Sequence, residues 1–261
     1  MRGVVYGLAL RLSWVVVVPV LRARARRRLA RLVPGAVTVV TVNWNSAPYL
    51  ETLLRIVRAR SRDDVRIIVV DNGSRDRSKS LLRSRPDVRT IALPINVGHD
   101  LALDIGFLSV ETEYAVALDV DAFPVHERWL DELLAPLSSG STIAGARLNR
   151  NYVHPCCLAL RTARFVERGL SFRANYRPRE EGRDASGDLG EEMSAREASN
   201  LHFFDPTSQR GPGDVGTVFG GLVYHNFYST RFRTTDEGVL DAVVHSDDAE
   251  AAWAEALARY G

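Results

Sequence analysis

Two aspartates, Asp119 and Asp121, stand two residues apart directly after an apolar run at 114–118. On an extended segment, residues i and i+2 point to the same side, so both carboxylates can face one ion. Mg²⁺ and Mn²⁺ prefer carboxylate ligands in combination with phosphate oxygens. The pair therefore predicts a divalent-metal site that binds a phosphate-bearing substrate.

Three earlier apolar runs, at 37–42, 65–70 and 88–93, are also followed by polar residues, namely Asn43 and Asn45, Asp71, and Asn96 and Gly98. Segments with helical spacing of leucine and valine separate the runs. This alternation predicts an α/β fold with an open, mostly parallel sheet flanked by helices. In such sheets ligands bind beyond the carboxyl ends of the strands, so the four polar clusters should form one site.

The second half of the chain is less regular. Runs at 142–146, 156–160 and 215–224 predict strands, 173–192 predicts a loop, and 189–201 and 247–260 predict helices. Ser46 is the expected cap of the helix that begins at 47. Cys156 and Cys157 are adjacent, which argues against a disulfide and favours a reducing compartment.

The quoted residues, taken in order, resemble a known family. Val-Val-Thr-Val-Asn-Trp-Asn at 39–45, Val-Val-Asp-Asn-Gly-Ser-Arg-Asp at 69–76, Asn-Val-Gly at 96–98 and Leu-Asp-Val-Asp at 118–121 are similar to the signature of family 2 glycosyltransferases with the GT-A fold. The resemblance covers roughly 36–135. It implies inverting transfer of a sugar from a nucleoside diphosphate sugar to an acceptor hydroxyl, assisted by Mg²⁺ or Mn²⁺.

The same resemblance implies roles for single residues. Asp71 matches the carboxylate that binds the base, and Asp119, Asp121 and His225 match metal ligands. The residues expected to contact the nucleotide sugar are Thr41, Asn43, Asn45, Asp71, Asn96, Gly98, Asp119 and Arg231. The chain departs from the family at His99, Asp100 and Asp104, where a further Gly and an Asn are frequent, so the donor sugar stays undefined. His154 and His202 lack comparable context and are left out.

Inverting transfer needs a general base on the acceptor hydroxyl. The family places an acidic residue ahead of a helix in the second half, and Asp188 fits that position best, with Glu191 and Glu192 as alternatives. The expected organisation is a segment at 1–33 followed by one domain at 34–261. Within that domain, 34–137 would bind the nucleotide sugar and 138–261 would hold the acceptor and the base.

The segment at 1–33 is apolar over 3–21 and then carries six arginines between Arg22 and Arg31. Three interpretations are open: a membrane span, a helix that lies on anionic lipid, and a helix packed on the domain. If the segment spans the membrane, the arginines place the domain on the cytoplasmic side. The expected acceptor is a saccharide or glycolipid of the cell envelope, and a net charge of +2 gives no indication of a nucleic-acid partner.

Two other functions compete with glycosyl transfer. A haloacid-dehalogenase-type phosphatase also has Asp-x-Asp after a buried strand, and Asp247-Asp248 superficially resembles its later acidic motif. Against it, Phe123 stands where Thr or Val is usual, and the pair follows three earlier strands. The second competitor is a protein that binds sugar nucleotides without turnover.

Overall fold

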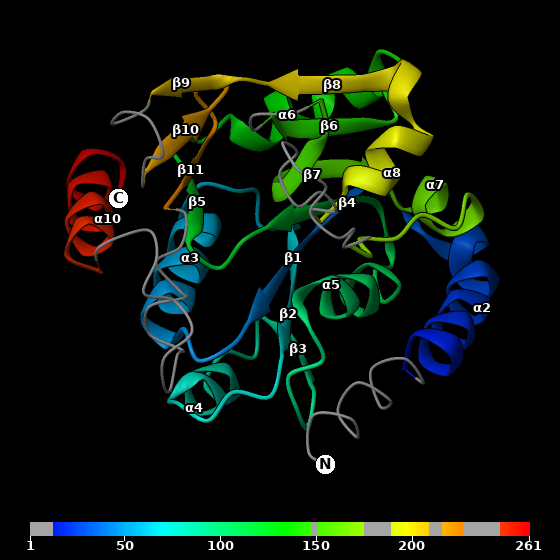
Figure 1. Cartoon of the computed structure of the whole chain (residues 1–261), viewed down its shortest axis with the longest axis horizontal. Helices are drawn as coiled ribbons and strands as arrows, with labels where there is room; N and C mark the ends of the chain where they lie inside the picture. Colours follow the sequence, from blue (N-terminus) through cyan, green and yellow to red (C-terminus); the bar gives the residue numbers. More distant parts are fainter. Residues whose placement is uncertain (1–12, 148–150, 175–188, 209–215, 227–245) are drawn as a thin grey trace, which may run out of the picture.

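Four parallel strands form one half of a seven-stranded sheet in the computed structural model of the chain (Figure 1). Their order is β3-β2-β1-β4, and their bounds are β1 (Val33–Asn43), β2 (Arg66–Asp71), β3 (Arg89–Ala92) and β4 (Thr112–Leu118). The structure describes residues 13–147, 151–174, 189–208, 216–226 and 246–261. Because the four strands are parallel, their carboxyl ends meet at one edge, as the alternation of the sequence predicted.

The other half of this sheet continues beyond β4 in the order β7-β6-β8. β7 runs antiparallel to β4 and to β6, and β8 runs parallel to β6. The bounds are β6 (Ile143–Arg147), β7 (Val153–Arg161) and β8 (Leu201–Phe204). The mostly parallel α/β sheet flanked by helices is therefore confirmed, and β7 lies directly beside β4, the strand that precedes Asp119.

A small antiparallel sheet packs next to the large one, in the order β5-β11-β10-β9. Its strands are β5 (Ala122–Pro124), β9 (Pro206–Ser208), β10 (Thr217–Phe219) and β11 (Val223–His225). The prediction of one strand over 215–224 is wrong, because Gly220 and Gly221 adopt φ of 57° and 70° and turn the chain back on itself. An added Cβ at Gly220 would lie 2.5 Å from the Phe204 ring, so this turn needs glycine.

Helices cover both faces of the large sheet. One face carries α3 (Ala47–Ala59), α4 (Ser78–Arg83) and α6 (Trp129–Ser138), and the other carries α2 (Val18–Arg28), α5 (His99–Phe107) and α7 (Thr162–Glu167). Along β1, Val37 and Val39 enter the first core cluster, while Val40 and Val42 enter the second. A strand buried on both faces needs a continuous apolar run, which is what the sequence has.

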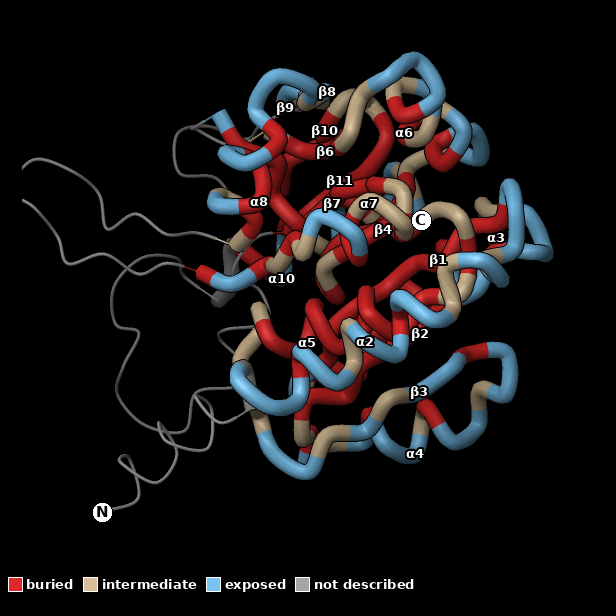
Figure 2. The backbone as a smooth tube through the Cα atoms, turned by 90° about the vertical axis from the view of Figure 1, so that its right-hand side faces the viewer, coloured by how far each residue is buried: buried red, intermediate tan, exposed pale blue. Residues whose placement is uncertain are grey.

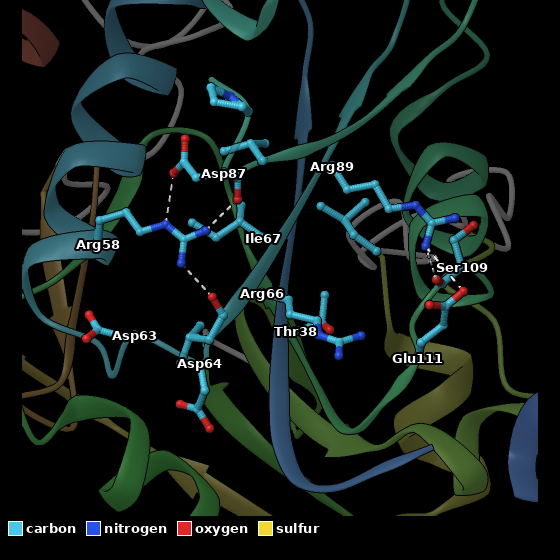
Figure 3. A pocket seen from close by; sticks show the side chains of 14 residues that line it. Thr38, Arg58, Asp63, Asp64, Arg66, Ile67, Asp87, Arg89, Ser109 and Glu111 are labelled. Atoms are coloured by element: carbon cyan, nitrogen blue, oxygen red, sulfur yellow. Dashed lines mark hydrogen bonds and ion pairs between the residues drawn. The ribbon is translucent and has the colours of Figure 1, made fainter. Parts of the chain in front are cut away.

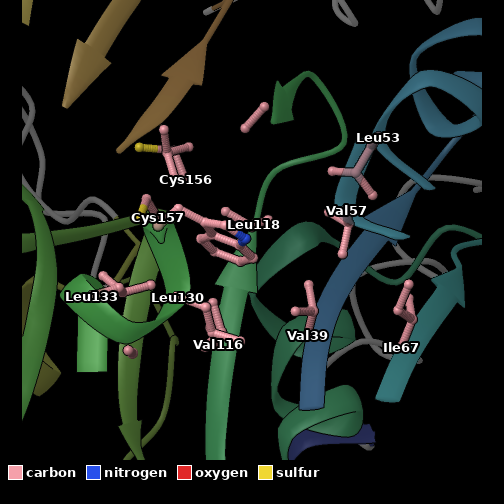
Figure 4. Close-up of a cluster of buried hydrophobic side chains, with 14 of the residues drawn as sticks. Val39, Leu53, Val57, Ile67, Val116, Leu118, Leu130, Leu133, Cys156 and Cys157 are labelled. Carbon is pink, nitrogen blue, oxygen red and sulfur yellow. The ribbon is translucent and has the colours of Figure 1, made fainter. Parts of the chain in front are cut away.

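Figure 4 shows the first core cluster, in which Val39, Val116 and Leu118 of the sheet pack under α3 and α6. Leu118 is the last residue of β4 and is 1% exposed. Cys156 and Cys157 both belong to this cluster and are free thiols, as the sequence predicted. Burial of Leu118 fixes the point at which the next residue, Asp119, leaves the core.

The remaining elements lie at the periphery of the molecule, whose buried segments follow the sheets (Figure 2). They are η1 (Ser13–Val17), η2 (Leu29–Arg31), α8 (Glu191–Arg196), η3 (Ala198–Asn200) and α10 (Ser246–Tyr260). Trp253 of α10 packs edge-on against Tyr49 and Phe123, so the predicted C-terminal helix is docked on the domain. Among the described residues, no helix is both long and apolar enough to cross a membrane.

Two arginines attach α2 to the domain. Arg22 donates to the carbonyl oxygens of Phe165 and Leu170 at 3.0 and 2.7 Å, and Arg28 donates to that of Leu108 at 2.6 Å. Over Val18–Arg28 the structure therefore shows a helix packed on the domain. The side chains of these two arginines of the basic run point toward the domain.

The interior beneath α2 contains one carboxylate, Asp104 of α5, which is fully buried. Its oxygens accept hydrogen bonds from Ser171 Oγ at 2.6 Å and from the Phe172 N–H at 2.9 Å. Burial raises the pKa of Asp104 to about 7, although both hydrogen bonds and the charge of Arg22 oppose the rise. Asp104 thus attaches the segment that follows α7, at Ser171 and Phe172, to α5.

We predict that Asp104→Asn removes a pH dependence of stability. The folded protein holds the Asp104 proton more tightly than the unfolded chain, so wild-type stability falls as pH rises from about 4 to about 7. The loss amounts to roughly 1.4 kcal/mol for each pH unit between the two pKa values. Urea unfolding across this range should show a flatter profile for Asp104→Asn, whereas Asp63→Asn, at an exposed position, should follow wild type. Parallel profiles for wild type and Asp104→Asn would contradict the prediction.

Candidate functional site

Asp119, Asp121 and His225 meet at the carboxyl edge of the large sheet. The turn after β4 delivers the two aspartates, and Ala122 N–H closes it on the Asp119 carbonyl oxygen at 3.0 Å. β11 pairs with β5 so that His225 lies opposite Ala122. His225 Nε2 is 3.3 Å from Asp119 Oδ2 and 3.2 Å from Asp121 Oδ1. Residues more than a hundred positions apart are thus joined by one strand pair.

The three side chains offer a donor set that fits a divalent ion. One ligand atom from each residue lies within 4.8 Å of the other two. Asp119 Oδ1 is buried and accepts no hydrogen bond among the described residues. Two carboxylates and one imidazole suit Mn²⁺. The two carboxylates also suit Mg²⁺, which prefers oxygen ligands over an imidazole nitrogen.

His225 interacts electrostatically with the two aspartates of this cluster. Burial by itself would lower the pKa of His225, but Asp121 and Asp119 raise it well above its usual value. Burial would raise the pKa of Asp119, but His225 and His99 hold it below its usual value. A protonated His225 therefore offsets part of the negative charge of the two aspartates, and a divalent ion would offset all of it.

Two further histidines surround the aspartates. His99, the first residue of α5, brings Nε2 to 3.4 Å from Asp119 Oδ1. His154 of β7 accepts a hydrogen bond from the Cys156 N–H at 3.1 Å, and its ring centroid lies 6.3 Å from that of His225. No pattern in the sequence selected His154, because only the pairing of β7 with β4 brings it here. His202, also left out, is exposed on β8.

A second polar cluster forms where β1 and β2 end. Asn43 and Asp71 are register partners, and Asn43 Nδ2 donates to Asp71 Oδ1 at 3.2 Å and to Ser74 Oγ at 3.1 Å. Asn45, at φ 51°, accepts a hydrogen bond from the Arg75 N–H at 2.7 Å. Three buried oxygens here have no partner among the described residues: Thr41 Oγ1, Asn43 Oδ1 and Asp71 Oδ2. Unsatisfied buried oxygens of this kind are suited to binding the donor groups of a ligand.

The loop that carries Asn96 and Gly98 is held by Asn72. Asn72 Nδ2 donates to Asn96 Oδ1 at 3.0 Å and to the Gly98 carbonyl oxygen at 3.2 Å, while its Oδ1 accepts from the Val97 N–H at 2.8 Å. Gly73 allows this close approach, because a Cβ there would lie 2.5 Å from the Ile95 carbonyl carbon. Asn72 organises the site without having been selected from the sequence, where Asn72-Gly73 reads as a simple turn.

Asp76 caps the start of α3, a role that the sequence predicted for Ser46. Asp76 Oδ2 accepts a hydrogen bond from the Ala47 N–H at 3.0 Å, at the start of α3. Ser46 instead donates to the Trp44 carbonyl oxygen and makes no capping bond to the helix. The prediction of a Ser46 cap is wrong, because a carboxylate from the neighbouring loop reaches the helix end first.

The residues proposed from the sequence in the second half of the chain are only partly described. Asp188 and Arg231 lie outside the described residues. Glu191 and Glu192 begin α8, where Glu191 is partly buried and Glu192 is exposed. Ser194 of the same helix accepts the Val153 N–H at 3.0 Å, which places α8 beside the start of β7.

A hollow of about 630 Å³ lies on the opposite side of the sheet, at the amino ends of β1, β2 and β3 (Figure 3). Two ion pairs lie in its lining, Arg58 with Asp87 at 3.0 Å and Arg89 with Glu111 at 3.6 Å. A second hollow of about 610 Å³ is lined by Asp71 together with Lys79 and Arg83 of α4. Only the second hollow includes a residue of the carboxyl-edge site.

The sequence profile described as Glycosyl transferase family 2 matches residues 38–180, which is more than half of the chain. The chain belongs to this family. It is a family 2 glycosyltransferase domain, as the four ordered motifs indicated.

Similar proteins agree with this membership. The teichoic acid poly(glycerol phosphate) polymerase of Staphylococcus epidermidis is 32% identical over 89 residues, which cover 32% of this chain and 12% of that protein. An uncharacterised glycosyltransferase of Nostoc sp. is 30% identical over 89 residues, covering 33% of this chain and 28% of that protein. The match thus spans less than a third of the length of these relatives.

Solved structures show the same GT-A fold. The mannosyltransferase PcManGT from Pyrobaculum calidifontis, in complex with GDP-Man and Mn²⁺, has a TM-score of 0.51 at 19% identity, covering 80% of this chain and 70% of that one. TarS from S. aureus, in complex with UDP-GlcNAc, has a TM-score of 0.50 at 15% identity, covering 86% and 72%. At these identities the likeness concerns the fold.

We predict that Mn²⁺ raises the Tm of this glycosyltransferase domain through His225. A ligand that binds only the folded state stabilises it by mass action. Metal and proton compete for the imidazole, so the Tm increase should grow as pH rises. His225→Gln should show a smaller increase without this pH dependence, and His202→Gln, on the exposed side of β8, should behave as wild type. An equal Mn²⁺ response in all three proteins would exclude His225 as a ligand.

Proposed function

We propose that this domain transfers a sugar from a nucleoside diphosphate sugar to an acceptor hydroxyl, with inversion at the anomeric carbon. The observation that carries the proposal is the meeting of Asp119, Asp121 and His225 at the sheet edge where Asn43 and Asp71 also end. A phosphate-binding metal site beside a cluster of hydrogen-bonding groups matches the two ends of a nucleotide sugar. PcManGT and TarS, which share the fold, bind GDP-Man and UDP-GlcNAc.

On the metal side, Asp119, Asp121 and His225 would hold the ion. Bound Mg²⁺ or Mn²⁺ would supply positive charge to the donor diphosphate, whose negative charge grows as the sugar leaves. Because the two carboxylates are fixed by the turn after β4, they need little rearrangement to bind an ion. Arg231 is proposed as a further phosphate contact on the grounds of the family resemblance.

On the nucleotide side, Asp71 Oδ2 is proposed to accept an N–H of the base. Thr41, Asn43 and Asn45 would line the same end of the nucleotide, with Asn96 and Gly98 nearer to the ribose and diphosphate. The hollow lined by Asp71 and by Lys79 and Arg83 of α4 leaves space for a ligand group beside Asp71.

On the acceptor side, the proposed base is Asp188, with Glu191 and Glu192 as alternatives. An inverting transfer requires the base to lie across the sugar from the leaving diphosphate, so that the hydroxyl attacks from the far side. The acceptor is proposed to be a saccharide or glycolipid of the cell envelope, which agrees with the teichoic acid relative. A cytoplasmic location stays a prediction, supported by the two free cysteines.

The central prediction concerns Asp121. Asp121→Asn keeps the size of the side chain but removes one anionic ligand, and we expect kcat/KM for sugar transfer to fall by about 10²–10³. The assay presents UDP-, GDP- and dTDP-sugars with Mn²⁺ and follows nucleoside diphosphate release. Asp87→Asn, in a surface ion pair at the opposite edge of the sheet, is the control that should keep full activity.

The same assay separates the competing functions. Full Mn²⁺-dependent turnover by Asp121→Asn would overturn the proposed metal site. Release of phosphate from simple phosphomonoesters would favour the haloacid-dehalogenase alternative, against which family membership already argues. Donor binding without any turnover would favour a sugar-nucleotide-binding protein that has lost catalysis.

The identity of the base is tested by three isosteric variants. We expect Asp188→Asn to lower kcat by about 10²–10⁴ while leaving donor affinity unchanged, since the base acts on the acceptor. Glu191→Gln and Glu192→Gln should retain most activity. Loss of activity in one of these two variants, with Asp188→Asn active, would transfer the role to that glutamate.

A further inference from the structure

The outer face of the N-terminal helical segment carries an unusual set of residues. Val15, Val16 and Val20 expose 71%, 55% and 47% of their surface. Helical spacing places Val16 and Val20 on one side together with the exposed arginines Arg24, Arg27 and Arg31, and Val15 extends the apolar end next to Val16. A helix on a protein surface normally shows polar residues to water, so three largely exposed valines within six residues indicate a partner surface.

The inner face of the same segment shows why these residues point outward. Val18 and Ala25 are buried in the second core cluster, and Arg22 and Arg28 bind backbone carbonyls of α7, the loop after it, and the end of α5. Helical spacing then places positions 20, 24, 27 and 31 on the opposite side. In Figure 2, where this side of the molecule faces the viewer, α2 lies in front of α5 as a mostly exposed stretch. The docking of α2 therefore fixes the outward direction of the valines and arginines.

The charge of this part of the chain indicates what the partner is. Eight arginines and no acidic residue precede Glu51, the first carboxylate in the sequence. A second copy of the chain seated on this face would bring two arginine rows together, and residues 1–12 carry two arginines and no acidic residue that could pair with the row. A surface that combines an apolar layer with negative charge complements both the valines at the start of the helical segment and the arginines at its end.

We propose that the face formed by Val15, Val16, Val20, Arg24, Arg27 and Arg31 docks on an anionic lipid bilayer. The valine end would enter the boundary between headgroups and acyl chains, and the arginines would bind lipid phosphates. Each arginine near an anionic surface contributes about a fivefold gain in binding. The proposal is independent of the donor site, because no residue of the docking face belongs to that site.

Docking on this face would orient the whole domain. α2 is held by Arg22 to Leu170, and Asp104 holds the next two residues, so the helix and the start of the acceptor half are attached to each other. A domain fixed in this way presents the same side to the membrane in every molecule. A lipid-linked acceptor would then meet the domain in a constant orientation.

The test uses the full chain without donor or metal, sedimented with vesicles. We expect binding to vesicles of phosphatidylcholine containing phosphatidylglycerol, and little binding to phosphatidylcholine alone. The variant Arg24→Gln, Arg27→Gln, Arg31→Gln should bind about a hundredfold more weakly. The matched control removes three exposed arginines elsewhere, Arg55→Gln, Arg66→Gln and Arg128→Gln, and should bind as wild type. Equal loss in both triple variants would overturn the proposal, since net charge alone would then explain binding.

A second measurement reports on the valine end. An environment-sensitive fluorophore on Val20→Cys should emit as a water-exposed probe in buffer and shift to the blue with anionic vesicles. Blue emission already present in buffer would overturn the proposal, because residues 1–12 or a second copy would then cover the face. Size-exclusion chromatography with light scattering in the same buffer distinguishes these two occupants. Unchanged far-UV circular dichroism of each variant ensures that loss of binding is not loss of fold.

Discussion

Two carboxylates at the end of a hydrophobic strand need positive charge close by, and the arrangement of this domain supplies it from the far end of the chain. Asp121 is 4% exposed, so water screens it poorly. The cation is His225, brought into place by the pairing of β11 with β5. That pairing in turn requires the tight turn at Gly220 and Gly221. The small second sheet therefore holds the His225 imidazole opposite the two aspartates.

The large sheet positions the second polar cluster, at the ends of β1 and β2, in a similar way. Parallel strands end at one edge, and the register that pairs Asn43 with Asp71 lets their side chains share a hydrogen bond. The core clusters on both faces leave β1 and β2 no freedom to slip, because a shift by one residue would exchange the two faces. Asn72, buried in the adjoining loop, extends this rigidity to Asn96 and Gly98. The polar groups are thus preorganised before any ligand binds.

The sequence predicted what depends on local pattern. Runs of apolar, largely β-branched residues predict buried strands. Asp119, Asp121, Asn43 and Asp71 were selected because each follows such a run. What depends on pairing between distant segments was less accessible. His154 is close to His225 only because β7 lies beside β4. Asp76 displaced Ser46 as the group at the start of α3 for the same reason: the competitor comes from another loop.

The departure at Asp104 shows how such distant pairing also shapes the interior. A carboxylate in this position would be costly if ionised and isolated. Here two donors from the chain after α7 and the guanidinium charge of Arg22 offset part of that cost, yet burial still raises its pKa to about 7. Arg22 belongs to the N-terminal helix, so that helix contributes electrostatically to the core as well as through Val18 and Ala25. The basic segment is therefore integrated with the domain on its inner face, which leaves only its outer face to act elsewhere.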